Sequence, residues 1–140
     1  MKTSVAFAIL AAASAAAPAL AAGDAAEGEK IFLKCRACHE IVSPDGDAIQ
    51  RGGKVGPNLY GVIGRPAGSS EGFRGYSDSM VAAGEKGLVW DEETFTAYVQ
   101  DPTAFLRDYL GDASARGKMT FKLRDGMADI HAYLVSVAPD

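Results

Sequence analysis

The pentapeptide Cys35-Arg-Ala-Cys-His39 constrains this chain more than any other feature, because it holds both cysteines and one of the two histidines. A disulfide across two intervening residues closes a very small loop and stabilises little. A zinc site of the usual four-ligand kind would need a second cysteine pair, which the sequence lacks. A thioredoxin-like redox motif needs a βαβ context, and nothing upstream of Cys35 has the pattern of a strand. The pattern C-x-x-C-H is instead typical of covalent haem attachment.

The residues before this motif predict a helix that presents both thiols and the imidazole on one face. Asp24 can cap this helix, and Glu27 follows three residues later, as in a capping box. Residues three and four apart share a helical face, and the resulting stripe contains Gly28, Phe32, Cys35 and the pair Cys38 and His39. Thiols in this arrangement can bond to the two vinyl groups of one porphyrin edge, while the imidazole reaches the iron.

A second axial ligand decides the class of haem protein, because an open position admits small ligands whereas a second strong ligand leaves only electron transfer. Besides the initiator, the candidates are Met80, Met119, Met127 and His131. Met127 falls on the apolar stripe of a predicted C-terminal helix and is interpreted as core packing. Met80, at a short helix start, is also assigned to packing, and His131 to the surface or to a satisfied hydrogen bond. Met119 lies in a loop without helical periodicity, which favours it as the ligand.

The first residues have the pattern of an export signal. Lys2 precedes an apolar, Ala-rich run, and Ala19-Leu-Ala21 is typical of a cleavage site. A membrane anchor is the alternative, but the apolar run is short for a bilayer span, which needs about 20 residues. We therefore expect a cleaved signal peptide at 1–21 and one domain at 22–140, located in the periplasm and not inserted in a membrane.

The remaining sequence predicts helices joined by long loops rich in Gly and Pro, without internal repeats. Asp91 can cap a helix through "EETFTAYVQ", and Pro102 can open another helix that ends at Gly111. Asp125 is expected to cap the final helix, and Pro139 to end it. The loops are too long for a domain of this size unless they enclose something large, such as a macrocycle.

Several longer motifs extend the pattern over nearly the whole of 22–140. They are "GEKIFLKCRACH", "KVGPNLYGVIGR", "GFRGYSDSM", "GLVWDEETFTAYVQDP", "GKMTFKL" and "ADIHAYLVSV". In these motifs the chain resembles the class I cytochromes c, and within them the bacterial cytochrome c2 subgroup with long loops. The resemblance implies an all-α cytochrome c fold, with about five helices and long loops wrapped around one covalently attached haem c.

The resemblance also implies roles for the residues around the iron. Cys35 and Cys38 would hold the haem through thioether bonds, and His39 and Met119 would ligate the iron from opposite sides. The carbonyl of Pro57 would accept a hydrogen bond from the second nitrogen of His39 and so orient the imidazole. From the residues alone, Pro57 is equally well explained as a turn residue in a Gly-rich loop.

Four further residues take their expected roles from the same resemblance. Tyr98 would place its hydroxyl near the sulfur of Met119, and Tyr76 and Trp90 would donate hydrogen bonds to buried propionates. Arg65 would offset a propionate charge. Taken without the family, Tyr98 and Trp90 are equally compatible with core packing, and Arg65 with a solvated loop.

Two departures from the family pattern leave the hydrogen bonding around Met119 open. The segment 103–117, "TAFLRDYLGDASARG", is longer than the compact one of small-loop cytochromes, and Gly117 replaces a frequent threonine.

Elsewhere the resemblance is close, and it implies that the first and last helices cross where Gly28 and Phe32 meet Ile130 and Tyr133. Gly28 would allow a close approach of the two backbones there.

The charge distribution bears on the choice of partner. Without Lys2 the chain has 13 basic and 18 acidic residues, a net charge of −5, so nucleic acid is not expected to bind. Basic residues flank both the haem motif and Met119. They form an expected basic rim of Lys34, Arg36, Arg116, Lys118 and Lys122, and Arg124 lies next to it in sequence. Such a rim would direct the protein to acidic docking sites. Ordinary solvated loop charges are the alternative.

We therefore expect a monomeric electron carrier rather than an enzyme. By resemblance, it would receive electrons from a quinol-cytochrome c reductase and deliver them to a photosynthetic reaction centre or a terminal oxidase. The alternative from another class is a small haem enzyme or gas sensor with an open axial position. A dedicated donor to one periplasmic dehydrogenase or reductase would keep the chemistry and change only the partner.

Overall fold

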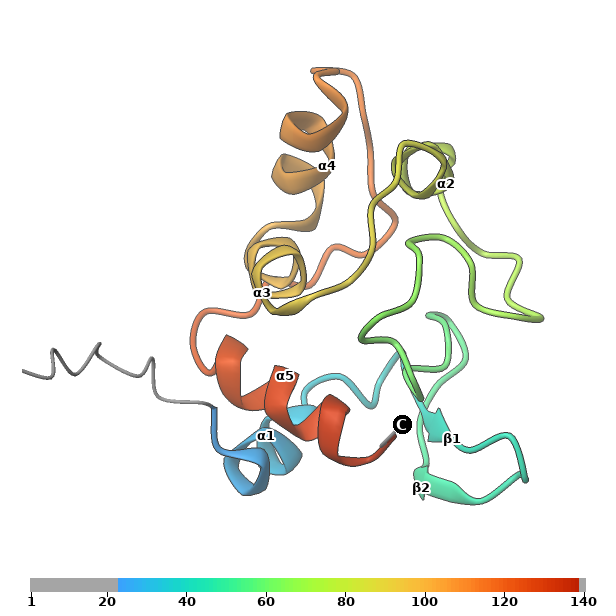
Figure 1. Ribbon diagram of the computed structural model, residues 1–140, viewed down its shortest axis with the longest axis vertical. Helices are drawn as coiled ribbons and strands as arrows, with labels where there is room; N and C mark the ends of the chain where they lie inside the picture. Colours follow the sequence, from blue (N-terminus) through green and yellow to red (C-terminus); the bar gives the residue numbers. More distant parts are fainter. Residues whose placement is uncertain (1–22, 139–140) are drawn as a thin grey trace, which may run out of the picture.

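Five helices joined by long loops make up the described part of the chain. The computed structural model describes residues 23–138. The elements, in chain order, are α1 (Ala25–Phe32), β1 (Ile41–Val42), β2 (Ala48–Gln50), α2 (Asp78–Glu85), α3 (Glu92–Gln100), α4 (Pro102–Leu110) and α5 (Met127–Ser136) (Figure 1). The predicted all-α fold with about five helices is confirmed, whereas the predicted signal peptide and Pro139 lie outside the described residues. No helix within 23–138 is long and apolar enough to cross a bilayer.

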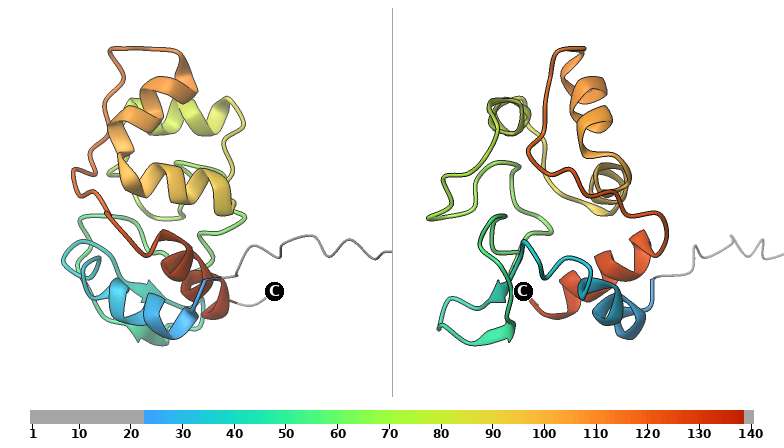
Figure 2. Two further views of the ribbon diagram at one scale, coloured as in Figure 1. Left: turned by 90° about the vertical axis from the view of Figure 1, so that its left-hand side faces the viewer. Right: turned by 180° about the vertical axis from the view of Figure 1, so that it is seen from behind.

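Helices α1 and α5 cross at one end of the molecule, as predicted (Figures 1 and 2). A Cβ built on Gly28 would lie 2.0 Å from the backbone oxygen of Asp129 and 2.7 Å from the Cβ of Tyr133. The rings of Phe32 and Tyr133 pack with their centroids 5.9 Å apart, and Ile130 is 2 % exposed. The crossing therefore depends on a residue without a side chain at position 28.

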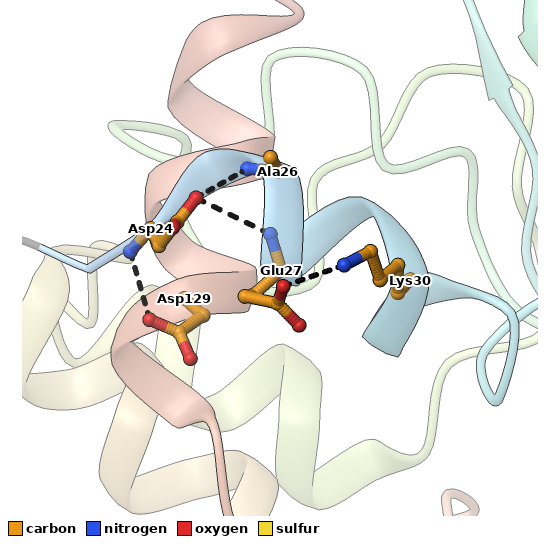
Figure 3. A network of polar contacts seen from close by, with 5 residues as sticks. All are labelled: Asp24, Ala26, Glu27, Lys30 and Asp129. Carbon is orange, nitrogen blue, oxygen red and sulfur yellow. Dashed lines mark hydrogen bonds and ion pairs between the residues drawn. The ribbon is translucent and has the colours of Figure 1, made fainter.

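The start of α1 is capped differently from the expectation (Figure 3). Asp24 is the N-cap, because its Oδ1 accepts hydrogen bonds from the backbone nitrogens of Ala26 and Glu27. The predicted capping box is wrong, since the side chain of Glu27 pairs with Lys30 instead. The backbone nitrogen of Asp24 donates to Oδ1 of Asp129 at 2.8 Å, so α5 supplies the reciprocal partner.

Helices α2, α3 and α4 form the other half of the molecule (Figure 2). Asp91 caps α3 with a reciprocal bond to Thr94, Pro102 opens α4, and Gly111 ends it with φ of 67°. These three predictions are confirmed. The cap predicted at Asp125 is wrong: the N-cap of α5 is Gly126, with φ of 72° and no side-chain cap.

A short antiparallel hairpin of β1 and β2 was not expected from the sequence. It turns at Gly46, whose φ of 91° favours glycine. The side chain of Gln50 donates a hydrogen bond to the Tyr133 hydroxyl at 3.0 Å and so ties the hairpin to α5. Between the two halves lies one buried cluster, which includes Phe32, Leu88, Trp90, Tyr98, Leu106 and Leu134.

Candidate haem site

The C-x-x-C-H motif lies on helical turns that continue α1 beyond its regular end at Phe32. The backbone nitrogen of Cys35 donates to the oxygen of Phe32 at 2.8 Å, and that of His39 to the oxygen of Cys35 at 2.9 Å. Both thiols are free, Cys35 half-buried and Cys38 exposed. Burial raises the pKa of the Cys35 thiol to about 11, so the group is protonated at neutral pH. Cys35, Cys38 and His39 thus keep the helical spacing inferred from the sequence, although they lie beyond the end of α1.

A Gly-rich loop wraps around the motif and fixes its backbone. The nitrogen of Gly53 donates to the oxygen of Arg36, and that of Gly56 to the oxygen of Cys38, both at 2.8 Å. A Cβ on Gly52 would lie 1.9 Å from the backbone oxygen of His39. This close approach explains the run of glycines in "RGGKVGP", whose composition alone predicts only a loop.

The same loop also holds the imidazole of His39. Its Nδ1 lies 2.8 Å from the backbone oxygen of Pro57. Since a carbonyl can only accept, Nδ1 carries the proton and Nε2 keeps its lone pair. A Cβ on Gly56 would lie 2.3 Å from Cε1 of the ring, so only glycine leaves room for it. Burial lowers the pKa of His39, which keeps the imidazole neutral and able to bind a metal at neutral pH.

Four of the predicted residues lie near one another: Arg65, Tyr76, Trp90 and Tyr98. The backbones of Arg65 and Trp90 are joined by a bond of 3.1 Å, and the rings of Trp90 and Tyr98 lie 4.9 Å apart. Burial lowers the pKa of Arg65, whose guanidinium donates to the carbonyls of Asn58 and Tyr60. Burial also raises the pKa of Tyr98, with a smaller contribution from nearby Tyr76. The phenol of Tyr98 therefore remains a hydrogen-bond donor.

Met119 lies in the irregular segment between α4 and α5 and is half-buried against the core cluster. Its neighbours Lys118 and Thr120 are exposed. Farther along, the nitrogen of Leu123 donates to the oxygen of Val99 in α3 at 2.8 Å, which returns the segment to the core. The thioether is therefore the one inward-facing sulfur of this segment.

The other ligand candidates have different surroundings. Met80 is buried at 7 % exposure within α2, and Met127 packs against the core from the first turn of α5. His131 packs near Phe95, with ring centroids 6.1 Å apart and the rings tilted by 50°. The interpretation of His131 as a surface or satisfied residue is wrong in one respect, because its Nε2 is buried and has no partner among residues 23–138.

The donor groups fit a haem better than a bare metal ion. No cluster of three or more His, Cys, Asp or Glu side chains exists within the described part of the chain. A neutral imidazole, an inward thioether and two free thiols are the groups that a c-type haem uses. In addition, Trp90 and Tyr98, which carry an indole N–H and a phenol O–H, are at most 9 % exposed. These two donors suit the polar edge of an enclosed ligand.

Comparison with known proteins places this site in a family. No family model matches the chain. The chain is 57 % identical over 130 residues to cytochrome c-551 of Roseobacter denitrificans, covering 93 % of this chain and 92 % of that protein. It is 53 % identical over 137 residues to cytochrome c2 of Rhodobacter capsulatus, covering 98 % of both.

Solved structures give the same result. Cytochrome c2 from Rhodobacter capsulatus matches with a TM-score of 0.79 and 54 % identity, covering 82 % of this chain and 98 % of that one. Ferric cytochrome c-550 from Paracoccus versutus matches with a TM-score of 0.80 and 50 % identity, covering 84 % and 99 %. The fold is therefore that of a class I c-type cytochrome, an electron-transfer protein rather than an enzyme. Within that class, the chain belongs to the cytochrome c2 family, and a c-type haem is its cofactor.

Proposed function

We propose that this protein is a periplasmic one-electron carrier whose haem is bound through Cys35 and Cys38 and ligated by His39 and Met119. The observation that carries the proposal is the bond between His39 Nδ1 and the Pro57 carbonyl, which leaves Nε2 as a neutral ligand atom. When bound, the haem would supply one-electron chemistry: it takes up and releases a single electron, and no substrate binds at the iron.

The chain's own residues tune and protect that centre. The Pro57 carbonyl strengthens donation from His39, and the thioether of Met119 favours the reduced state. The hydroxyl of Tyr98 orients the sulfur of Met119. Burial of these groups excludes water and lowers the local dielectric, which keeps the rearrangement on electron transfer small.

The propionates are bound by three donors. Tyr76 and Trp90 donate hydrogen bonds to them, and the half-buried guanidinium of Arg65 offsets their charge. The proximity of Tyr76 to Arg65 supports this set, because Tyr76 acts on the pKa of the guanidinium. A polar pocket lies between the start of α2 and the Met119 segment and is lined partly by Tyr76.

The proposed location and partners rest on sequence and charge. Residues 1–21 act as a cleaved signal peptide, and the monomeric domain at 22–140 works in the periplasm. It receives electrons from a quinol-cytochrome c reductase and delivers them to a photosynthetic reaction centre or a terminal oxidase. Docking uses the basic rim defined above.

The ion pairs within the rim indicate which of its charges remain free to act. Lys34 lies 3.8 Å from Asp125, and Lys122 bonds to Asp101, whose pKa it lowers. Lys118 is exposed and has no acidic partner among residues 23–138. Among the lysines of the rim, we therefore assign the largest share of steering to Lys118.

We expect salt to slow electron transfer to an acidic redox partner. Rates should fall about tenfold as ionic strength rises from roughly 0.01 to 0.2 M, because screening weakens attraction between exposed charges. The Lys118→Gln variant should flatten this dependence. Lys30→Gln, which removes a lysine of α1 paired with Glu27, is the control and should retain it. A flat profile in the unmodified protein, measured by stopped flow, would count against the rim.

The proposed ligand set is tested by optical spectroscopy of the haem-loaded chain. The ferric protein should show the weak red band of sulfur-to-iron bonding, and the ferrous protein should not bind carbon monoxide at neutral pH, since both axial positions are filled. Ready binding of carbon monoxide would support the haem enzyme or gas sensor instead. Capture of one periplasmic dehydrogenase or reductase as the sole redox partner would favour a dedicated donor.

A further inference from the structure

Three consecutive loop residues before Met119, numbers 115–117, each form a hydrogen bond with a side chain of α2 or α4. Nε of Arg107 in α4 donates to the oxygen of Ala115 at 3.2 Å. The nitrogen of Arg116 donates to Oγ of Ser79 in α2 at 3.0 Å. The nitrogen of Gly117 donates to Oγ1 of Thr103 in α4 at 3.4 Å, the longest of the three. We call Ser79, Thr103 and Arg107 the loop clamp.

The loop clamp is one of two anchors that bracket Met119. On the near side, Ala115 is 3 % exposed, and Leu106 reaches to 3.4 Å from the position of a Cβ on Gly117. On the far side, Leu123 is 4 % exposed and bonded to α3. Between the anchors, Met119 is the one residue that is not exposed. The anchors thus determine where its sulfur lies.

The two helices that carry the loop clamp are themselves joined. Nζ of Lys86, at the end of α2, donates to the oxygen of Tyr109 in α4 at 2.8 Å and lies 5.6 Å from the centre of its ring. The segment that follows α4 runs back between α4 and α2 (Figure 1). Helix α4 lies directly before this segment along the chain. Its side chains provide two of the three contacts.

We propose that the loop clamp positions Met119 and sets how often this residue leaves the iron. The inference rests on the proposed function, in which Met119 is the axial ligand. An external ligand can occupy the axial position only after the segment has moved away. The population of that open state depends on the free energy of the anchoring bonds, so each bond removed should increase it.

The test is imidazole binding to the ferric, haem-loaded full chain at neutral pH. Ser79→Ala should tighten apparent imidazole binding about fivefold, the size expected for one net hydrogen bond. Thr103→Val should tighten it about threefold, because its bond is longer. Ser79→Thr and Thr103→Ser retain the hydroxyl and should restore the original affinity.

Two controls separate positioning from general loosening. The hydroxyl of Thr96 bonds only to carbonyls of its own helix, as does that of Ser136. Thr96→Val and Ser136→Ala should therefore leave imidazole binding unchanged. Equal tightening in clamp and control variants would overturn the proposal, as would no tightening in the clamp variants.

Hydrogen exchange gives a readout that does not depend on the added ligand. The amides of Arg116 and Gly117 should exchange slowly in the unmodified protein, and faster in Ser79→Ala and Thr103→Val respectively. Fast exchange of both amides in the unmodified protein would overturn the proposal even if a variant fails to fold. Failure of the ligand assignment is recognised separately, because the red band would then survive the loss of Met119.

Discussion

Replacing Met119 by alanine is expected to abolish the red band of the ferric protein and to open the iron to carbon monoxide and imidazole. Under the proposed ligand set, the variant leaves His39 as the only protein ligand. Since the thioether favours the reduced state, the reduction potential should fall on the order of 0.1 V or more, within the roughly 0.8 V range that axial ligands set. Potentiometric titration and carbon monoxide binding measure both effects.

Two matched variants make this prediction specific. Met127→Ala removes a methionine that packs at the first turn of α5, and His131→Ala removes the other histidine, which lies beside Phe95. Both should leave the band and the potential almost unchanged, although Met127→Ala should lower the free energy of unfolding by about 2 kcal/mol through the cavity it creates. Loss of the band in His131→Ala alone would contradict the ligand assignment.

The sequence predicts best where one short stretch determines the structure. Asp91 and Pro102 define helix starts through their own side chains, and Gly111 ends a helix through its own backbone. The C-x-x-C-H motif likewise specifies its cofactor from five residues. In each of these, the physical cause lies within a turn or two of the residue concerned.

Prediction failed where the partner comes from far along the chain. The bond from Asp24 to Asp129 spans 105 positions, and it replaces a local capping box that was equally plausible by spacing. Gly126 serves as N-cap of α5 in place of Asp125, and a Cβ there would lie 2.2 Å from the side chain of Ile31 in α1. The contacts of Gly56 with the His39 ring also need the folded chain to be seen. Polar patterns in sequence do not specify which of several possible partners a backbone group will meet.

The same reasoning applies to the segment before Met119. Its departures from the family, a longer insertion and Gly117, left its hydrogen bonds open in the sequence. In the folded chain, helix α4 provides Thr103 and Arg107 as partners for that segment. Two of the three partners therefore lie within 103–117, the same stretch whose length left the hydrogen bonding open.

Replacing Gly28 by alanine should destabilise the protein, although alanine is intrinsically the better helix former. The intrinsic preference favours alanine by about 1 kcal/mol in the middle of a helix. The new Cβ, however, would lie 2.0 Å from the backbone oxygen of Asp129, a rigid atom that cannot turn away as a side chain would. Helix α5 would have to move, which disturbs the packing of Phe32 on Tyr133 and the bond from Asp129 to Asp24.

The clash is the larger effect, because overpacking a rigid contact costs about 1–3 kcal/mol and the displaced contacts add to it. We expect a net loss of about 2–3 kcal/mol in the free energy of unfolding, measured by denaturant titration of the haem-loaded chain. Glu29→Ala, at the neighbouring exposed position of α1, removes only a hydrogen bond of 3.4 Å from Gln50 and should change the free energy of unfolding by less than about 0.5 kcal/mol. A Gly28→Ala variant more stable than the unmodified protein would mean that α1 and α5 do not approach this closely. Because α1 leads directly into the turns that carry Cys35 and His39, the variant should also bind imidazole more tightly if the crossing supports the site.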